Sequence, residues 1–297
     1  MLVVDAHNHA AWLGVGIDEH VANMDAQGIA VTWLLTWEAP EAEIPPYYAD
    51  ILNSRREGLP LADAVEAARR HPGRFVLGYC PDPREPAALD RLSAAIERCG
   101  VRTCGEWKLR MPFDDPRNLR LLRFCAEKHL PVTVHLTYAR KDPARPEAAD
   151  YWYAGSMEAL ERALQAVPGL TLIGHGPGFW ANISGDGKHL TDHNPTGPVV
   201  PGGAVERLMR GYANLYADLS GRSGSNALER DPAFGRDFAI EFADRLLFAR
   251  DAFDGLCRQT LDALDLPPEC REKIMGGNAT RLAPLGPAGV ESGSERP

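Results

Sequence analysis

The sequence predicts an α/β protein that folds as a single (β/α)8 barrel of the TIM type. Its 297 residues are an ordinary length for one such barrel. Short apolar segments alternate with amphipathic helical segments along the chain, as expected of parallel strands joined by helices. A doubly wound open sheet is the alternative, and it is weakened because no G-x-G-x-x-G motif follows the first strand.

Eight apolar segments are predicted to form buried strands. The first is the run Leu2-Val3-Val4, which leads into Asp5-Ala6-His7-Asn8-His9. Residues 29–35 are rich in β-branched and aliphatic side chains, which favour strands. The others are expected at residues 75–79, 103–109, 132–135, 170–175, 214–218 and 245–250.

Helical segments lie between these strands. Residues 17–27 place Ile17, Val21 and Met24 on one face, and Gly28 ends that helix. Residues 61–70 form an Ala-rich helix that ends before Pro72. Further helices are expected at residues 87–98, 116–129, 155–166, 204–210, 232–242, 255–264 and 268–275.

The rest of the chain is expected to form loops and a tail. Residues 37–59 and 179–203 are irregular and carry several prolines, so we expect them to fold over one end of the barrel. The barrel should occupy residues 1–285 as one domain. Residues 286–297 are rich in Gly, Ser, Pro and Glu without apolar periodicity, which predicts a disordered tail.

The composition indicates a protein that acts on small molecules. Net charge is -9, and no Lys/Arg cluster interrupts the acidic balance, which argues against nucleic-acid and membrane-surface partners. No export signal and no apolar stretch of roughly 18 residues is visible. The six cysteines are scattered without a CxxC pair, as in reduced cytoplasmic proteins.

Most predicted strands are followed by side chains that can bind a metal or transfer a proton. The catalytic residues of a barrel gather at the C-terminal ends of its strands, so we expect these side chains to lie together. In chain order they are His7, His9, Glu106, Lys108, His135, His175, Asp218 and Asp251.

The pair His7 and His9 indicates a metal ion. Side chains two apart on a strand point the same way, and converging imidazoles suit a divalent metal. His175 lies between Gly174 and Gly176, which leave room for a group close to the backbone. Asp251 could bind the metal or accept a proton from a bound water.

The motifs together resemble the amidohydrolase superfamily. The order is Asp-x-His-x-His, a His after the fifth and the sixth strand, and an Asp after the eighth. Residues 214–220, Asn-Leu-Tyr-Ala-Asp-Leu-Ser, and residues 277–279, Gly-Asn-Ala, are similar to the amidohydrolase-related branch that includes aminocarboxymuconate semialdehyde decarboxylase. The likeness runs from residue 2 to about residue 285, and barrels of this branch often form homodimers.

The resemblance implies a role for each matching residue. His175 would lie beside the metal as a polarising group or proton shuttle. One Zn²⁺ ion is expected, with a second ion or another divalent metal left open, since some superfamily members bridge two metals with a strand-four Glu or carboxylated Lys. The implied ligands are His7, His9, His135 and Asp251, with Glu106 as a further candidate.

Four other residues are candidates for contact with the substrate. Lys108 could bind an anionic substrate, or it could pair with Glu106. Arg250 stands where the branch commonly has Ser or Thr, and it either adds a cation near the substrate or forms a salt bridge. Trp12 and Trp180 follow strand ends and could line the pocket, with loop packing as the alternative.

These observations predict a metal-dependent hydrolase. A metal-activated water would attack the C–O or C–N bond of a lactone, ester or amide, with His175 polarising the substrate and Asp251 accepting the water's proton. The alternative is a non-oxidative decarboxylase of a small aromatic or unsaturated acid, with its carboxylate aligned by Arg250 or Lys108. A non-catalytic binding barrel stabilised by metal is disfavoured by the complete ligand set.

Overall fold

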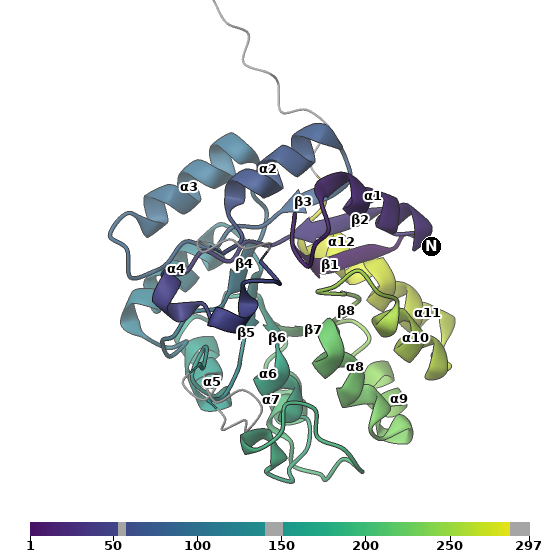
Figure 1. Ribbon diagram of the computed structural model, residues 1–297. Coiled ribbons are helices and arrows are strands. Elements are labelled where there is room, and N and C mark those ends of the chain that lie inside the picture. The colour runs from purple at the N-terminus through teal and green to yellow at the C-terminus, as the bar shows by residue number, and fades with distance from the viewer. Residues whose placement is uncertain (53–57, 140–150, 286–297) are drawn as a thin grey trace, which may run out of the picture.

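The computed structural model describes residues 1–52, 58–139 and 151–285, and all eight predicted strands are present. They form two parallel sheets, β1-β2-β3 and β4-β5-β6-β7-β8, ringed by helices (Figure 1). Their bounds are β1 Val4–Asn8, β2 Val31–Leu34, β3 Phe75–Leu77, β4 Cys104–Trp107, β5 Val132–His135, β6 Leu172–His175, β7 Leu215–Asp218 and β8 Leu246–Leu247.

Backbone contacts cross both gaps between the two sheets. Gly78, after β3, forms a parallel bridge with Thr103, before β4. On the other side, the Ala6 amide of β1 donates to the Phe248 carbonyl after β8, at 2.9 Å. The strands therefore follow one another in chain order, as in a (β/α)8 barrel, and their C-terminal ends meet at one face.

Helices cover the outside of the strands. The predicted helix at residues 268–275 divides into α11 and a π-helical turn, Lys273–Gly277. The helices matching predictions are α1 Ile17–Ala26, α2 Leu61–Arg70, α3 Ala88–Cys99, α4 Pro116–Glu127, α5 Met157–Ala166, α7 Ala204–Gly211, α9 Pro232–Glu241, α10 Leu256–Ala263 and α11 Pro268–Glu272.

Three short helices were not predicted. α6 (Pro177–Ala181) overlaps the start of the stretch expected to be a loop, and α12 (Asn278–Leu282) follows the π turn. α8 (Gly221–Glu229) has the sequence GRSGSNALE, whose glycines and serines are poor helix formers. Burial stabilises it instead, since Ser223 to Leu228 are all buried.

The core holds most large apolar side chains, including three fully buried tryptophans, Trp33, Trp107 and Trp180. All six cysteines are free thiols, and five of them are buried. Among the described residues, no helix combines the length and the apolar character needed to cross a membrane. The predicted disordered tail, residues 286–297, lies outside the described residues.

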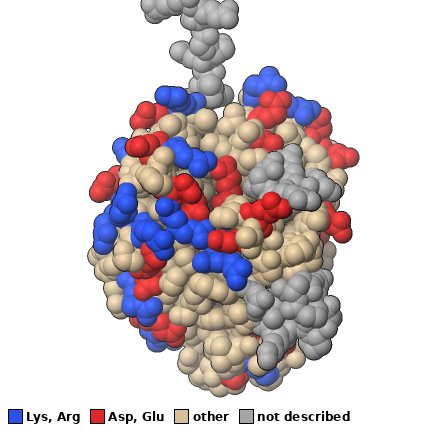
Figure 2. All heavy atoms as spheres, turned by 60° about the vertical axis from the view of Figure 1, so that its left-hand side comes forward, with Lys and Arg blue, Asp and Glu red and all other residues tan. Residues whose placement is uncertain are grey.

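Surface charges of both signs lie close together. Figure 2 shows Lys and Arg interspersed with Asp and Glu on the face that carries the left-hand helices of Figure 1. Arg162 pairs with Asp114 at 2.5 Å, and Arg117 pairs with Asp115 at 2.8 Å. Such exposed pairs contribute little to stability individually.

Candidate metal centre

Strand β1 carries the first two histidines into the barrel. The strand starts later than the apolar run suggested, at Val4, and Leu2 is exposed. His7 is the fourth residue of this strand, His9 follows its end, and both are buried. Their side chains lie on the same side, with ring centroids 5.4 Å apart.

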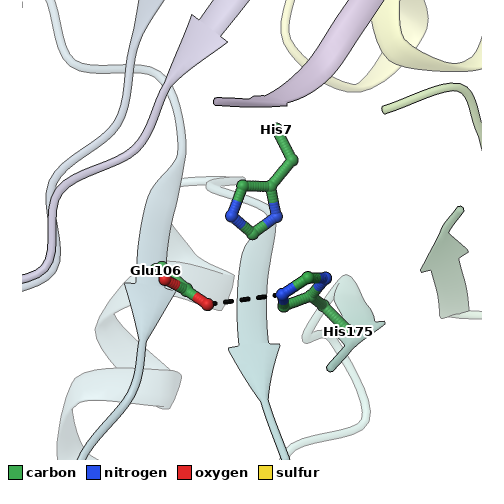
Figure 3. Close-up of side chains that lie close together, drawn as sticks. All are labelled: His7, Glu106 and His175. Atoms are coloured by element: carbon green, nitrogen blue, oxygen red, sulfur yellow. Dashed lines mark ion pairs between the residues drawn. The ribbon is translucent and has the colours of Figure 1, made fainter. Parts of the chain in front are cut away.

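Five side chains from four parts of the barrel converge on one point. The His9 Nε2 atom lies 3.4 Å from Asp251 Oδ1 and 3.7 Å from Glu106 Oε2. The His175 Nε2 atom lies 3.4 Å from Glu106 Oε1 and 3.7 Å from Asp251 Oδ2. The His7 Nε2 atom lies 3.7 Å from Asp251 Oδ1. Figure 3 shows His7, Glu106 and His175 pointing toward one another from β1, β4 and β6.

Oxygen acceptors behind the histidines fix which nitrogen of each ring faces the centre. Asp218, at the end of β7, accepts from Nδ1 of His7 at 2.9 Å and from Nδ1 of His175 at 3.0 Å. The Leu35 carbonyl lies 2.8 Å from Nδ1 of His9. A carboxylate or carbonyl only accepts, so each Nδ1 carries a proton, and Nε2 is the atom that faces inward and offers a lone pair when the ring is neutral. Asp218 raises the pKa of His7 and of His175 against the opposing effect of burial, so a bound cation would replace a proton at these Nε2 atoms.

These inward atoms fit a divalent metal. The Nε2 atoms of His7 and His175 and the Oδ1 atom of Asp251 are buried without a hydrogen-bond partner. Leaving buried polar atoms unpaired is costly unless a ligand completes them. Two overlapping groups have atoms close enough to hold an ion: His7, Glu106 and His175, and His7, His9 and Asp251. Imidazole and carboxylate ligands suit Zn²⁺ and Mn²⁺ alike.

His135 lies differently from the role that the resemblance implied. Its Nδ1 atom lies 2.5 Å from Glu106 Oε1, and its Nε2 atom lies 2.8 Å from the Thr137 hydroxyl. Both ring nitrogens therefore have protein partners, whereas His175 presents a free one. The ring of His135 lines the adjoining cavity. Among the described residues, the groups with atoms close enough to hold an ion include His175 and do not include His135.

The cavity beside the centre is mostly apolar and aromatic. Lys108 brings its ammonium into this cavity, 4.3 Å from the ring centroid of Trp37, 5.0 Å from that of Tyr48 and 5.7 Å from that of Tyr153. The described residues that line the cavity are His9, Trp12, Trp37, Tyr48, Ile51, Leu52, Leu59, Glu106, Lys108, His135 and Asp251.

Lys108 has no ion-pair partner among the described residues. Glu106, two residues before it, instead contacts His135, His175 and His9. Glu106 and Lys108 therefore do not form the direct ion pair that was the alternative for Lys108. Burial opposes charge on Lys108, but the nearby Glu106 carboxylate outweighs it and raises the Lys108 pKa, so the ammonium stays charged. The aromatic faces add cation–π attraction and do not accept its N–H groups as a carboxylate would.

Strong fields act on the ionisable groups of the centre. Burial opposes charge on Glu106, but Lys108 and His135 outweigh it and hold the Glu106 pKa well below its usual range. Burial also opposes charge on Asp218, and His175 and His7 outweigh it, so the pKa of Asp218 is lowered strongly. For His135, burial and the charge of Lys108 lower the pKa to about 3. The carboxylates are thus ionised and His135 neutral near neutral pH.

Two expected substrate contacts lie elsewhere. Arg250 is buried, and its Nε atom donates to Asp5 at 2.7 Å, so it forms a salt bridge outside the cavity. Trp180 is buried in the core on α6, where its Nε1 donates to the Asp218 carbonyl at 2.8 Å. Trp12 does line the cavity, with its ring centroid 4.7 Å from that of His9.

The two glycines around His175 accommodate protein rather than a ligand. A Cβ on Gly174 would lie 2.2 Å from a ring carbon of Phe179. Gly176 has a φ of +94°, and a Cβ there would lie 2.8 Å from the Leu136 carbonyl. Both positions therefore need glycine so that β5, β6 and α6 can pack closely.

Sequence reasoning gave no role to Asp218 or to the tyrosines around Lys108. Asp218 was recognised as a strand end, which is the signal that could have assigned it. Tyr48 and Tyr153 come from segments far apart in the chain, and no spacing in the sequence links them to Lys108.

Comparison with known proteins identifies relatives over nearly the whole chain. The family model described as amidohydrolase matches residues 4–285. No curated protein sequence matches significantly. The fold is similar to solved structures of low sequence identity, which support the barrel alone.

Three of these structures illustrate the range of activities that their descriptions give. A 2,6-dihydroxybenzoate decarboxylase from Rhizobium is 18% identical with a TM-score of 0.59, covering 95% of this chain and 98% of that one. A putative 2-pyrone-4,6-dicarboxylic acid hydrolase from Pseudomonas putida is 18% identical with a TM-score of 0.58, covering 95% and 97%. A dihydroxybenzoic acid decarboxylase from Polaromonas, solved with manganese and 2-nitroresorcinol, is 17% identical with a TM-score of 0.54, covering 89% and 85%.

Proposed function

The chain belongs to the amidohydrolase family of metal-dependent enzymes, and from this premise we propose that it hydrolyses a lactone, ester or amide of a small anionic molecule. One divalent ion is proposed, with Zn²⁺ as the default and Mn²⁺ as the alternative that the Polaromonas structure suggests. The proposed ligands are His7, His9, Glu106, His175 and Asp251.

The observation that carries this proposal is the set of inward atoms without partners. His7 Nε2, His175 Nε2 and Asp251 Oδ1 are buried and unpaired, while oxygen acceptors hold the Nδ1 atoms of His7 and His175. Metal-binding histidines typically donate their other ring N–H to such an oxygen acceptor, which fixes the tautomer and the orientation of the ring. A bound divalent ion would supply Lewis acidity, lowering the pKa of a water to about 7 and polarising a carbonyl.

The residues that line the cavity have different proposed roles in proton transfer and substrate binding. Asp251, whose side chain is 20% exposed, lines the cavity and accepts the proton of the attacking water. His135 faces the substrate space and, through its bonds to Glu106 and Thr137, keeps a fixed orientation beside the reacting carbonyl. Lys108 binds the anionic group of the substrate, and Trp12, Trp37 and Tyr48 contact its apolar frame.

A non-oxidative decarboxylase is the second candidate. The observation that makes it a candidate is the aromatic lining around the Lys108 ammonium, because Trp37 and Tyr48 can stack on the ring of a flat aromatic acid whose carboxylate Lys108 binds. In that reaction Lys108 would orient the acid, the C–C bond to its carboxylate would break with release of CO₂, and a proton would add to the carbon that keeps the electron pair.

The reaction can be assigned by product analysis. Purified protein, loaded with Zn²⁺ or Mn²⁺, is incubated with a panel of hydroxylated benzoates, pyrone and other lactone carboxylates, and aryl esters. Addition of water to the substrate supports hydrolysis, and CO₂ release supports the second candidate. Protein that binds no divalent metal and converts no member of the panel would overturn both.

A further inference from the structure

Arg250 occupies an unusual position for an arginine, fully enclosed behind the proposed metal centre. Its side chain is 1% exposed, and that of its partner Asp5 is completely buried. The Arg250 Nε atom donates to Asp5 Oδ2 at 2.7 Å, and its backbone amide donates to Asp5 Oδ1 at 2.9 Å. Arg250 Nη1 also reaches α1, where it donates to Asn23 Oδ1 at 2.5 Å. The arginine therefore joins β1, α1 and the segment after β8.

The backbone after β8 is fixed at four successive residues. Besides the Arg250 amide on Asp5, the Asp251 amide donates to the His7 carbonyl at 2.9 Å. Asn8 Nδ2 donates to the Ala252 carbonyl at 2.7 Å and to Asp5 Oδ2 at 3.2 Å. Asn23 Nδ2 donates to the Phe253 carbonyl at 2.8 Å. Asp5 and Arg250 hold the centre of this buried network.

Within this segment, Asp251 has a backbone conformation that residues other than glycine rarely adopt. Its φ is +50°, in the left-handed region. This conformation directs Oδ1 to within 3.4 Å of His9 Nε2 and 3.7 Å of His7 Nε2. A relaxed backbone would swing the carboxylate away from these two nitrogens, so the surrounding contacts must hold it.

We propose that Asp5 and Arg250 form a positioning unit that keeps Asp251 in its metal-facing conformation. This inference rests on the proposed metal centre, and it explains why this chain has Arg at position 250. An arginine reaches both Asp5 and Asn23, which a shorter side chain could not do from the same backbone position. Loss of the unit should lower metal affinity even in protein that remains folded, which a general loss of stability would not do.

The test compares two buried arginines. Arg250→Met removes the positioning unit, and Arg230→Met removes the ion pair between Arg230, whose side chain is 1% exposed, and Asp186, at 2.9 Å. Metal-free wild-type and variant proteins are titrated with Co²⁺, and the visible spectrum of the bound ion and its dissociation constant are recorded. The temperature is one at which thermal unfolding curves show that each protein is folded. The double variant Asp5→Asn with Arg250→Met, which removes both charges of the pair, and the single variant Arg250→Lys are measured in parallel.

We expect Co²⁺ affinity to fall about 10- to 100-fold in Arg250→Met, with an altered spectrum, as for other residues that orient metal ligands. Arg230→Met should lose thermal stability but bind Co²⁺ within about twofold of wild type. Should Arg250→Met fail to fold, the double variant and Arg250→Lys decide by the same criterion. Affinity within about fivefold of wild type in the folded position-250 variants overturns the proposal. Absence of Co²⁺ binding by the wild type would instead overturn the metal centre, and the positioning role with it.

Discussion

The carboxylate of Asp218 accepts a hydrogen bond from Nδ1 of His7 at 2.9 Å and from Nδ1 of His175 at 3.0 Å. One side chain on β7 therefore sets the tautomer of two imidazoles that come from β1 and β6. Ser220 adds a hydrogen bond from its hydroxyl to the same carboxylate, at 2.5 Å. Because both rings turn their Nε2 atoms to the same point, the orientation of His7 and His175 depends on this carboxylate, and the Ser220 hydroxyl also contacts His175 Nδ1, at 2.9 Å.

Replacing Asp218 by Asn should weaken metal binding about 10- to 100-fold, as for other residues that hydrogen-bond to metal-binding histidines and orient them. His7 and His175 donate to different oxygens of Asp218, and in Asn an NH₂ donor replaces one of these oxygens, so in the same orientation only one of the two contacts survives. The other imidazole must change tautomer or turn. Competition with a chelator measures the affinity. Ser220→Ala leaves both His–Asp contacts in place, and an equal loss in that variant would contradict the role given to Asp218.

Removal of the His175 side chain and removal of the His135 side chain should have different effects on metal content. His175 presents a free Nε2 atom, whereas both nitrogens of His135 have protein partners. We therefore expect His175→Ala to lose bound metal and activity together. His135→Ala should retain the metal and lose activity through its place beside the substrate. Metal content of each purified variant, measured with activity, checks this, and metal loss from His135→Ala alone would restore the ligand set that the sequence resemblance implied.

Lys108→Met should raise KM for anionic substrates by about 10- to 100-fold, the value of one charge-assisted hydrogen bond. The change in kcat should be smaller if Lys108 contacts the substrate equally in ground and transition states. A neutral analogue, such as a methyl ester, should show little change in KM. Lys128→Met is the control, because Lys128 also lies over an aromatic ring, 5.7 Å from the Phe124 centroid, but on the surface. Equal effects on charged and neutral substrates would remove the proposed anion contact.

The strands and the polar residues that follow them could be predicted from the sequence because both depend on local pattern. Apolar runs located all eight strands, and His7-x-His9 marked the first of their ends. The helix α8 was missed because its glycines and serines are poor helix formers, and burial stabilises it. The ring orientations of His135 and His175 were also out of reach, because they depend on Asp218, Glu106 and Thr137 across the barrel.

Gly174→Ala should destabilise the protein by about 1–3 kcal/mol through overpacking. The new methyl group would lie 2.2 Å from a ring carbon of Phe179, which is itself fully buried. Urea unfolding followed by circular dichroism gives the free energy of unfolding. Gly211→Ala, where nothing lies within 4 Å of the added Cβ, is the matched control and should change that free energy little or raise it. A Gly174 variant as stable as the control would show that the Phe179 ring moves aside without cost.

His20 should make stability fall with acidity. Its ring is buried between Phe75 and Phe253, at centroid distances of 5.6 and 4.9 Å. Burial first, and the charge of Arg250 second, lower its pKa from 6.5 to about 3. Below the unfolded-state pKa of about 6.5 the unfolded chain binds a proton that the folded protein does not bind, so the free energy of unfolding falls as pH decreases.

The slope contributed by His20 should approach about 1.4 kcal/mol per pH unit below pH 6.5 and above the folded-state pKa, with full stability retained above that window. Other groups also titrate there, so the comparison is with His20→Gln, which cannot take up a proton. Urea unfolding of both proteins, kept metal-free with chelator, at several values between about pH 5 and 7 gives the two slopes. Whatever the stability of the variant at pH 7, the slope of its free energy of unfolding against pH should be smaller by the equivalent of about one bound proton. Parallel curves would mean that His20 gains its proton in the folded protein as readily as in the unfolded chain, and that neither its burial nor Arg250 depresses its pKa.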